Sequence, residues 1–459
     1  MLKIFSSIPM DMNASFYYRI TLPLEQMEKQ GFESLSIVDD HKGTSRRPPL
    51  TPEERLEAFA LADINLVYQT ISPAYSHNIS TLRDRPPHYV SAKHVWYPPC
   101  FIADTDDDLF NCMPLNPAFK RLGIRAPDGS MLEDGSEIKI KHPQEDKEIV
   151  LWKDGEKGFD LDKNRARAES WRRVLQRVNL VTTTTQRARD YVLREVPSAD
   201  VFISPNAIDF EEYHKVELAD HPGEVRIMWQ GSHTHHEDLW PILNSIKRIT
   251  EKYPQVTWVF FGSPYPWLYR NLPAERVTAI KWVDYCAYKT RLSTINHDIN
   301  ICPLTPHPFN QSRSAIKFYE SSAIWKPAAT LAQRAGEYQD VIIEGETGML
   351  FDNPKQFEEK LSTLVEDSLL RVKMAANAKD WIKTHRDVGV IIPKLYEKYV
   401  EVREKYVKGL PEPLPWKEPH AKSVKQRSRT RKQPDIAGGS RKSGAGDRSG
   451  ERSQGVAVG

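Results

Sequence analysis

The stretch Asp298-Ile-Asn-Ile-Cys-Pro-Leu304, followed by Asn310-Gln-Ser-Arg-Ser-Ala-Ile-Lys-Phe-Tyr-Glu320, decides the fold of this chain. Its first segment is a short apolar run bounded by polar residues, which is typical of a buried strand. The second segment has helical spacing, and we expect a helix over 314–324. A strand that leads through a short polar loop into a helix is the repeating unit of a parallel sheet.

The same alternation extends over most of the chain. In the second half, strands are expected at 225–231, 256–262, 277–283 and 328–331, and helices at 238–253, 288–296, from 355 and from 368. In the first half, strands are expected at 2–8, 34–38, 64–69, 180–184 and 200–204, and helices at about 19–30, 52–62, 163–177 and 186–195. This order predicts two doubly wound α/β domains with a cleft between them.

The expected domain boundaries follow from composition. We expect one domain over 1–215, with three Asp-Gly pairs indicating a hairpin insertion at about 121–160, and a second over 216–408. The segment 215–224 is the best candidate for a linker. Residues 409–459 are rich in Pro, Ser, Gly, Arg and Lys, and we expect this tail to be disordered because it has few large apolar side chains to bury.

The charges are distributed unevenly. The chain of 459 residues has a net charge of +2, but residues 417–459 hold eleven basic and four acidic side chains, or +7, which leaves −5 for the rest. An acidic body argues against a nucleic-acid-binding core, since such binding depends on neutralising phosphates. Only the tail is expected to contact nucleic acid or an anionic surface, and a merely solvated tail is the simpler alternative.

The sequence lacks the patterns of a membrane span, a signal peptide, a disulfide framework and a metal site. No apolar run is long enough to span a membrane, and the first eleven residues lack the apolar core of a signal peptide, so a cytoplasmic protein is expected. The four cysteines form no C-x-x-C pair, and no histidine cluster has carboxylate or thiolate partners at ligand spacing. Neither a disulfide framework nor a bound metal is therefore predicted.

Two loops of the second half are candidates for ligand binding, because ligands of open α/β sheets bind beyond the carboxyl ends of the strands. The first loop begins at Gly231, where a glycine allows close approach to the backbone. Ser232 and Thr234 can donate hydrogen bonds to phosphate oxygens.

The second loop contains Asn310 and leads into the helix of the opening stretch. Ser312 or Ser314 is expected to cap this helix and leave its first N–H groups free for an anion. Arg313, Lys317 and Glu320 follow at helical spacing, which places them on one face. Two cations suit a diphosphate and the carboxylate suits ribose hydroxyls, although a solvated helix with a Lys317–Glu320 pair is an equal alternative.

Residues 225–385 resemble the donor half of a GT-B glycosyltransferase, most similarly family 4 and related bacterial and phage proteins. The resemblance is carried by the opening stretch together with Lys326-Pro-Ala-Ala and Ile342-Ile-Glu-Gly-Glu-Thr-Gly-Met-Leu-Phe351. It implies two Rossmann-like domains and a nucleotide-sugar donor. Glu320 would correspond to the second acid of the E-x7-E motif, which holds the ribose, and the first acid would fall at Ser312. Arg313 and Lys317 are then the candidates for neutralising the diphosphate.

The first half resembles that family more weakly, at Ala103-Asp-Thr-Asp-Asp-Asp-Leu-Phe-Asn111. Asp106, Asp107 and Asp108 are expected to line the acceptor side of the cleft, with a turn cap or a bound cation as alternatives. Arg19 is a further candidate for binding an anion on that side.

The predicted function is transfer of a sugar from a nucleoside-diphosphate donor to an unidentified acceptor, with retention of configuration. Arg313, Lys317 and Glu320 are the predicted catalytic residues, and neither a cofactor nor a divalent metal is required. Two alternatives stay open: a nucleotide-sugar epimerase of the same fold, and a non-catalytic binding protein that its tail tethers to nucleic acid.

Overall fold

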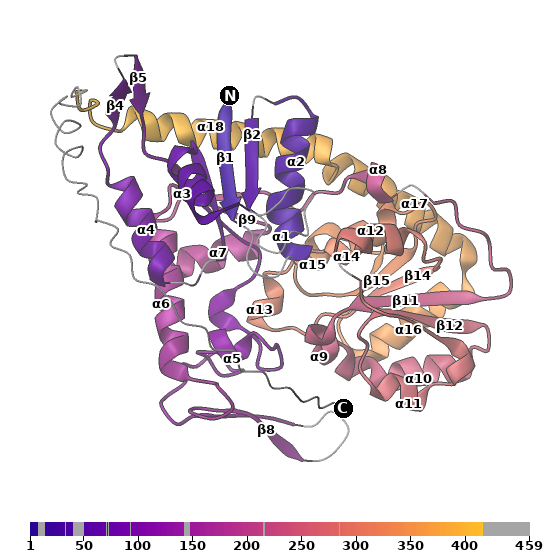
Figure 1. Ribbon diagram of the computed structural model, residues 1–459. Helices are drawn as coiled ribbons and strands as arrows, with labels where there is room; N and C mark the ends of the chain where they lie inside the picture. The colour runs from indigo at the N-terminus through magenta and orange to yellow at the C-terminus, as the bar shows by residue number, and fades with distance from the viewer. Residues whose placement is uncertain are drawn as a thin grey trace, which may run out of the picture. The chain divides into compact units, whose positions relative to one another are not determined.

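The computed structural model describes residues 1–7, 14–32, 34–39, 50–69, 71, 73–91, 93–141, 147–213, 216–283 and 285–415. The chain divides into two units, Met1–Leu414 and Pro415–Gly459, and the first contains the elements described below (Figure 1). The predicted disordered tail lies outside the described residues from residue 416 onward.

A six-stranded parallel sheet forms the centre of the first half, in the order β10-β9-β6-β3-β1-β2. Its strands are β1 (Leu2–Ser7), β2 (Ser34–Asp39), β3 (Ile64–Tyr68), β6 (Cys100–Thr105), β9 (Leu180–Thr183) and β10 (Val201–Ile203). The helices of this half are α1 (Ala14–Phe16), the π-helix η1 (Tyr17–Thr21), α2 (Leu22–Lys29), α3 (Pro52–Leu61), α4 (Pro73–Arg83), the 3-10 turn η2 (Leu109–Asn111), α5 (Phe119–Leu122), α6 (Leu161–Arg177), α7 (Gln186–Glu195) and α8 (Phe210–Tyr213). The strand order reverses at β1 and β3, so the sheet is doubly wound.

A second six-stranded parallel sheet, in the order β13-β12-β11-β14-β15-β16, forms the centre of the second half. Its strands are β11 (Val225–Gly231), β12 (Val256–Gly262), β13 (Val277–Ile280), β14 (Ile299–Cys302), β15 (Ala329–Gln333) and β16 (Met349–Phe351). The order reverses between β11 and β14, and this is the point at which ligands of such sheets bind.

The helices and 3-10 turns of the second half begin after Gly231. They are η3 (His233–His235), α9 (His236–Leu239), η4 (Trp240–Ile242), α10 (Leu243–Lys252), α11 (Trp267–Asn271), η5 (Ala274–Arg276), α12 (Tyr285–Ser293), α13 (Pro308–Gln311), α14 (Ile316–Ala323), α15 (Tyr338–Val341), α16 (Pro354–Glu366), α17 (Ser368–His385) and α18 (Val388–Lys408). The described residues form two antiparallel hairpins, which are β4 (His88–Ser91) with β5 (His94–Trp96) and β7 (Glu137–Lys141) with β8 (Glu148–Lys153). The second hairpin lies inside the range predicted for the insertion, 121–160.

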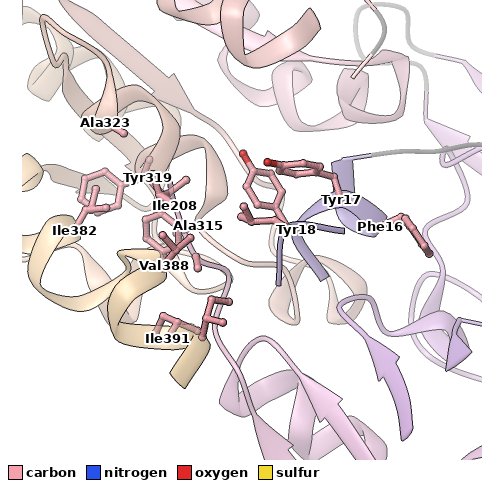
Figure 2. Close-up of a cluster of buried hydrophobic side chains, with 14 of the residues drawn as sticks. Phe16, Tyr17, Tyr18, Ile208, Ala315, Tyr319, Ala323, Ile382, Val388 and Ile391 are labelled. Atoms are coloured by element: carbon pink, nitrogen blue, oxygen red, sulfur yellow. The ribbon is translucent and has the colours of Figure 1, made fainter. Parts of the chain in front are cut away.

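The apolar core accounts for this architecture. Ile227 and Trp229 of β11 face a core that includes residues of α10 and α16, whereas Met228 faces a second core with residues of α14 and α17. A strand buried on both faces requires the continuous apolar run seen in the sequence. The second core also takes in residues of β1, β3 and β6, so apolar packing joins the two sheets. Figure 2 shows part of it, where Ile208 meets Ala315, Tyr319 and Val388.

The predicted end of the second domain is corrected by α18. This helix packs against α2 and β6 of the first half as well as against α17 of the second, so it belongs to both halves. Its Arg403 donates to the backbone oxygen of Pro98 at 2.7 Å and pairs with Asp63 at 3.2 Å. The predicted tail also begins too early, because the Leu414 backbone N–H donates to Pro87 at 2.8 Å. Among the described helices, none has the length and apolar character that a membrane-spanning segment needs.

Candidate functional site

The carboxyl ends of β11 and β12 are built around two glycines that pair in register. Gly262 has φ +117°, and a Cβ there would lie 2.2 Å from the Gly231 carbonyl oxygen. A Cβ on Gly231 would lie 2.7 Å from the Trp229 ring. Both positions therefore require glycine for packing, and the close approach of a ligand at Gly231 stays a prediction.

The loop after Gly231 forms the short turn η3. Ser232 caps this turn by accepting from the Thr234 N–H at 3.3 Å, and the two hydroxyl oxygens are 2.7 Å apart. A hydroxyl pair of this kind keeps donor capacity for a further ligand, because each oxygen carries one proton but the pair uses only one. Ser232 and Thr234 stay candidates for phosphate binding.

His235 and Asp238 anchor this loop. The His235 Nδ1 lies 2.8 Å from one Asp238 carboxylate oxygen. The other oxygen accepts from the Thr305 N–H at 2.8 Å and from Asn310 Nδ2 at 3.0 Å. Asn310 is 1% exposed, so it connects the two predicted loops rather than facing a ligand. Neither His235 nor Asp238 was predicted as a site residue, although their i, i+3 spacing on a polar turn was the available signal.

The helix that carries Lys317 begins later than we predicted. It starts at Ile316 with Ala315 as N-cap and has no side-chain cap, so neither Ser312 nor Ser314 caps it. The Ala315 N–H donates to the Glu337 carboxylate at 2.9 Å. The predicted free anion position at the helix start is therefore occupied by a carboxylate of the chain itself. Arg313 precedes the helix, which corrects the prediction that it shares one helical face with Lys317 and Glu320.

Arg313 nevertheless faces the same site as Lys317. Its Nη1 lies 3.1 Å from His235 Nε2, its Nε lies 3.5 Å from an Asp107 oxygen, and its guanidinium stacks over the Phe309 ring. Burial lowers the pKa of His235 to about 3, helped by the charges of Lys317 and Arg313. A neutral His235 accepts from Arg313 at Nε2 and donates from Nδ1 to Asp238.

Lys317 is the exceptional cation of this region. Its ammonium lies 5.8 Å from the centre of the Trp229 ring, and among the described residues it has neither a hydrogen bond nor an ion pair. Burial lowers the pKa of Lys317, and the Arg313 charge contributes to the decrease. Half-buried ammonium groups normally have an anionic partner. Among the described residues no carboxylate lies within ion-pair distance of the Lys317 ammonium, and Asp238 and Glu320 only oppose the decrease in its pKa from farther away.

Glu320 is enclosed by donors from both halves of the unit. Tyr18 Oη donates to Oε1 at 2.6 Å, while Tyr288 Oη and Gln230 Nε2 approach Oε2 at 3.0 and 3.2 Å. Tyr213 Oη lies 3.4 Å from Oε1. The Glu320 side chain is 2% exposed, and burial raises its pKa to about 7. The structure does not present this carboxylate to ribose hydroxyls, and it shows no Lys317–Glu320 ion pair.

Ser312 and Ser314 join the two halves instead of binding at the helix start. Ser312 Oγ accepts from the Asp108 N–H at 3.1 Å, and the Ser312 carbonyl accepts from Thr185 Oγ1 at 3.1 Å. Ser314 Oγ accepts from Asn206 Nδ2 at 2.8 Å. These contacts hold the Arg313 backbone against the first half.

The three acidic residues of the first half have different surroundings. Asp106 accepts from Tyr68 Oη at 3.0 Å and from Gln69 Nε2 at 2.8 Å. Asp108 caps the turn η2, as the alternative interpretation proposed, and also binds Arg194 at 3.1 Å. Asp107 alone reaches Arg313. The described residues form no metal-binding cluster of histidine, cysteine and acidic side chains.

Arg19 forms an internal ion pair. It lies on η1 and donates to both oxygens of Asp104 at 2.9 and 2.7 Å, with side chains 3% and 2% exposed. It also donates to the Ser204 carbonyl at 2.6 Å. The anion that Arg19 binds is thus Asp104, and the structure leaves its guanidinium no access to an external one.

Two doubly wound domains with their switch points at β1/β3 and β11/β14 define the GT-B fold class. Solved structures that share it include sucrose-phosphate synthase from Thermosynechococcus elongatus, with a TM-score of 0.56 and 11% identity over 88% of this chain and 100% of that chain. Anabaena HepE in complex with UDP-glucose matches with a TM-score of 0.53 and 11% identity over 87% and 100%. A Rickettsia africae glycosyltransferase matches with a TM-score of 0.53 and 12% identity over 87% and 98%. No family model and no curated protein matches the sequence.

Proposed function

We propose that this protein is a glycosyltransferase that uses a nucleoside-diphosphate sugar. The observation that carries the proposal is the unpartnered Lys317 ammonium beside Arg313, at the carboxyl end of the strands where a doubly wound sheet binds its ligand. A diphosphate supplies the anion that Lys317 lacks and can also bind Arg313, and charge-assisted bonds to phosphate are among the strongest in proteins. HepE, of the same fold, was solved with UDP-glucose, which supports the same class of donor here.

The proposed chemistry needs no protein base. The C1–O bond to the diphosphate breaks and a C1–O bond to the acceptor forms on the same face of the sugar. The acceptor hydroxyl proton passes to an oxygen of the departing phosphate. Lys317 and Arg313 stabilise the charge that develops on this leaving group, and the loss of one such contact typically slows a reaction about 10²–10³-fold.

A thermal-shift panel of nucleoside diphosphates, nucleotide sugars and inorganic pyrophosphate tests the donor class. A ligand present at 100 times its Kd stabilises the folded protein by about 2.7 kcal/mol. Lys317→Met should raise the Kd roughly 10- to 100-fold, the equivalent of one charged hydrogen bond. Lys326→Met is the matched control, because Lys326 precedes β15 at the opposite edge of the sheet and pairs with Asp220.

The outcome of the panel is decisive for the proposal. A folded wild-type protein that none of these ligands stabilises contradicts it, as does unchanged affinity in Lys317→Met. For a donor that binds, product analysis with and without acceptor separates transfer from epimerisation, because an epimerase converts the donor alone.

A further inference from the structure

Arg313 is held between the two halves by one neutral and one charged partner. The second half contributes His235, whose ring is fixed by Asp238 and accepts from Nη1 at 3.1 Å. The first half contributes Asp107, at 3.5 Å from Nε. Among the described residues Asp107 is the one carboxylate that pairs with this guanidinium.

The Asp107–Arg313 pair is loose by comparison with the Arg19–Asp104 pair inside the first half. Arg19 and Asp104 form two hydrogen bonds at 2.9 and 2.7 Å and are 3% and 2% exposed. Arg313 and Asp107 are 20% and 23% exposed, and the buried Arg313 Nε has no hydrogen bond. A pair with imperfect geometry and partial exposure gains little over separated, solvated charges, so a better anion can displace it.

We propose that Asp107 is an internal counter-ion of the donor site, which occupies Arg313 until a diphosphate displaces it. This inference rests on the proposed function, because it takes Arg313 and Lys317 as the diphosphate-binding pair. His235 keeps the guanidinium in place during the exchange, since its bond to Arg313 does not involve Asp107. A phosphate oxygen then takes the position at Nε that the carboxylate leaves.

The surroundings of Asp107 favour protonation of its carboxylate once Arg313 leaves it. Burial raises the pKa of Asp107 to about 7, and the neighbouring charges of Asp106 and Asp108 contribute, while Arg313 opposes the increase. A carboxylate that loses Arg313 beside two like charges binds a proton more readily. When the diphosphate displaces Asp107, the Asp107 carboxylate therefore takes up a proton and does not stay behind as an unpaired charge.

The test measures the Kd of inorganic pyrophosphate, and of whichever nucleoside diphosphate stabilises the protein, by calorimetry. Asp107→Asn and Asp107→Ala should each tighten binding about three- to tenfold, because Arg313 no longer has to leave a carboxylate. The same substitutions in an Arg313→Ala background should leave the Kd unchanged within twofold. Asp340→Asn is the matched control, since Asp340 pairs with Arg187 across the same two halves without contacting Arg313.

Each other outcome overturns the inference. Equal tightening with and without Arg313 would show simple charge repulsion, and unchanged or weaker binding in both Asp107 variants would show that no exchange occurs. If the wild type binds the ligands normally, such results reject the counter-ion alone. If neither the wild type nor any variant binds a ligand of the panel, the proposed function fails and the counter-ion with it.

Discussion

The Glu320 carboxyl should make the stability of this protein depend on pH between about 4.5 and 7. Burial raises its pKa in the folded chain from the ordinary 4.5 to about 7, against hydrogen bonds from Tyr18 and Tyr288 that lower it. The folded state then binds more protons than the unfolded state over that interval, so stability falls as the pH rises through it. At 1.36 kcal/mol per pH unit, the total is about 3 kcal/mol.

Glu320→Gln removes this titration and retains most of the contacts. The amide oxygen still accepts from Tyr18. The amide NH2 group takes the place of the carboxylate oxygen near Tyr288, so a donor stands there instead of an acceptor. The free energy of unfolding of the variant, minus that of the wild type, should rise by about 3 kcal/mol from pH 4.5 to 7 and stay level above pH 7. Other groups with raised pKa values, such as Asp107, are present in both proteins and cancel in this difference.

The assay is urea unfolding of both proteins at half-unit pH steps from 4.5 to 8, followed by tryptophan fluorescence. A difference that does not change with pH would refute the reasoning, because it would mean that Glu320 titrates alike in the folded and unfolded chains. A difference that falls with rising pH would also refute it, since the carboxylate would then be stabilised rather than penalised by burial.

Four further substitutions test the packing. Asp104→Asn leaves the buried Arg19 without its counter-ion and should lower the free energy of unfolding by about 3–5 kcal/mol. Arg187→Ala breaks a partly exposed pair and should lower it by less than about 1 kcal/mol. Equal losses in urea unfolding would contradict the argument that burial makes the first pair more important. Gly262→Ala forces a side chain into a φ of +117° against a backbone oxygen and should destabilise by about 1–3 kcal/mol, and an unchanged melting temperature would disprove the close approach. Arg403→Met should speed hydrogen exchange in α18 by removing its bonds to the first half, and unaltered exchange would show that apolar packing alone holds this helix.

The sequence predicted the fold well because its strands are continuous apolar runs. β11 and β12 begin and end at the predicted residues, since both faces of each strand are buried. The packing of α18 on the first half was not predictable in this way. Its apolar pattern shows that it is amphipathic, but it does not show which of two sheets the apolar face covers.

The site was predicted in part for a related reason. Local spacing placed Arg313 and Lys317 near each other, and both face one region even though the helix begins only at Ile316. The surroundings of Glu320 come from Tyr18, about 300 residues away in sequence, and such a contact leaves no trace in local spacing. The same holds for Asp107, whose role depends on a residue of the other half.

The serine at position 312 explains why the site departs from the motif it resembles. Ser312 is 2% exposed, and its Oγ accepts from the Asp108 N–H while donating to the Phe309 carbonyl at 2.8 Å. A carboxylate in that place would be buried against a carbonyl oxygen, which costs several kcal/mol unless a cation pairs with it. Ser312 thus holds the two halves together. In the proposed transferase, Lys317 and Arg313 would stabilise the leaving diphosphate, and the proton that this diphosphate takes from the acceptor hydroxyl would replace a protein acid.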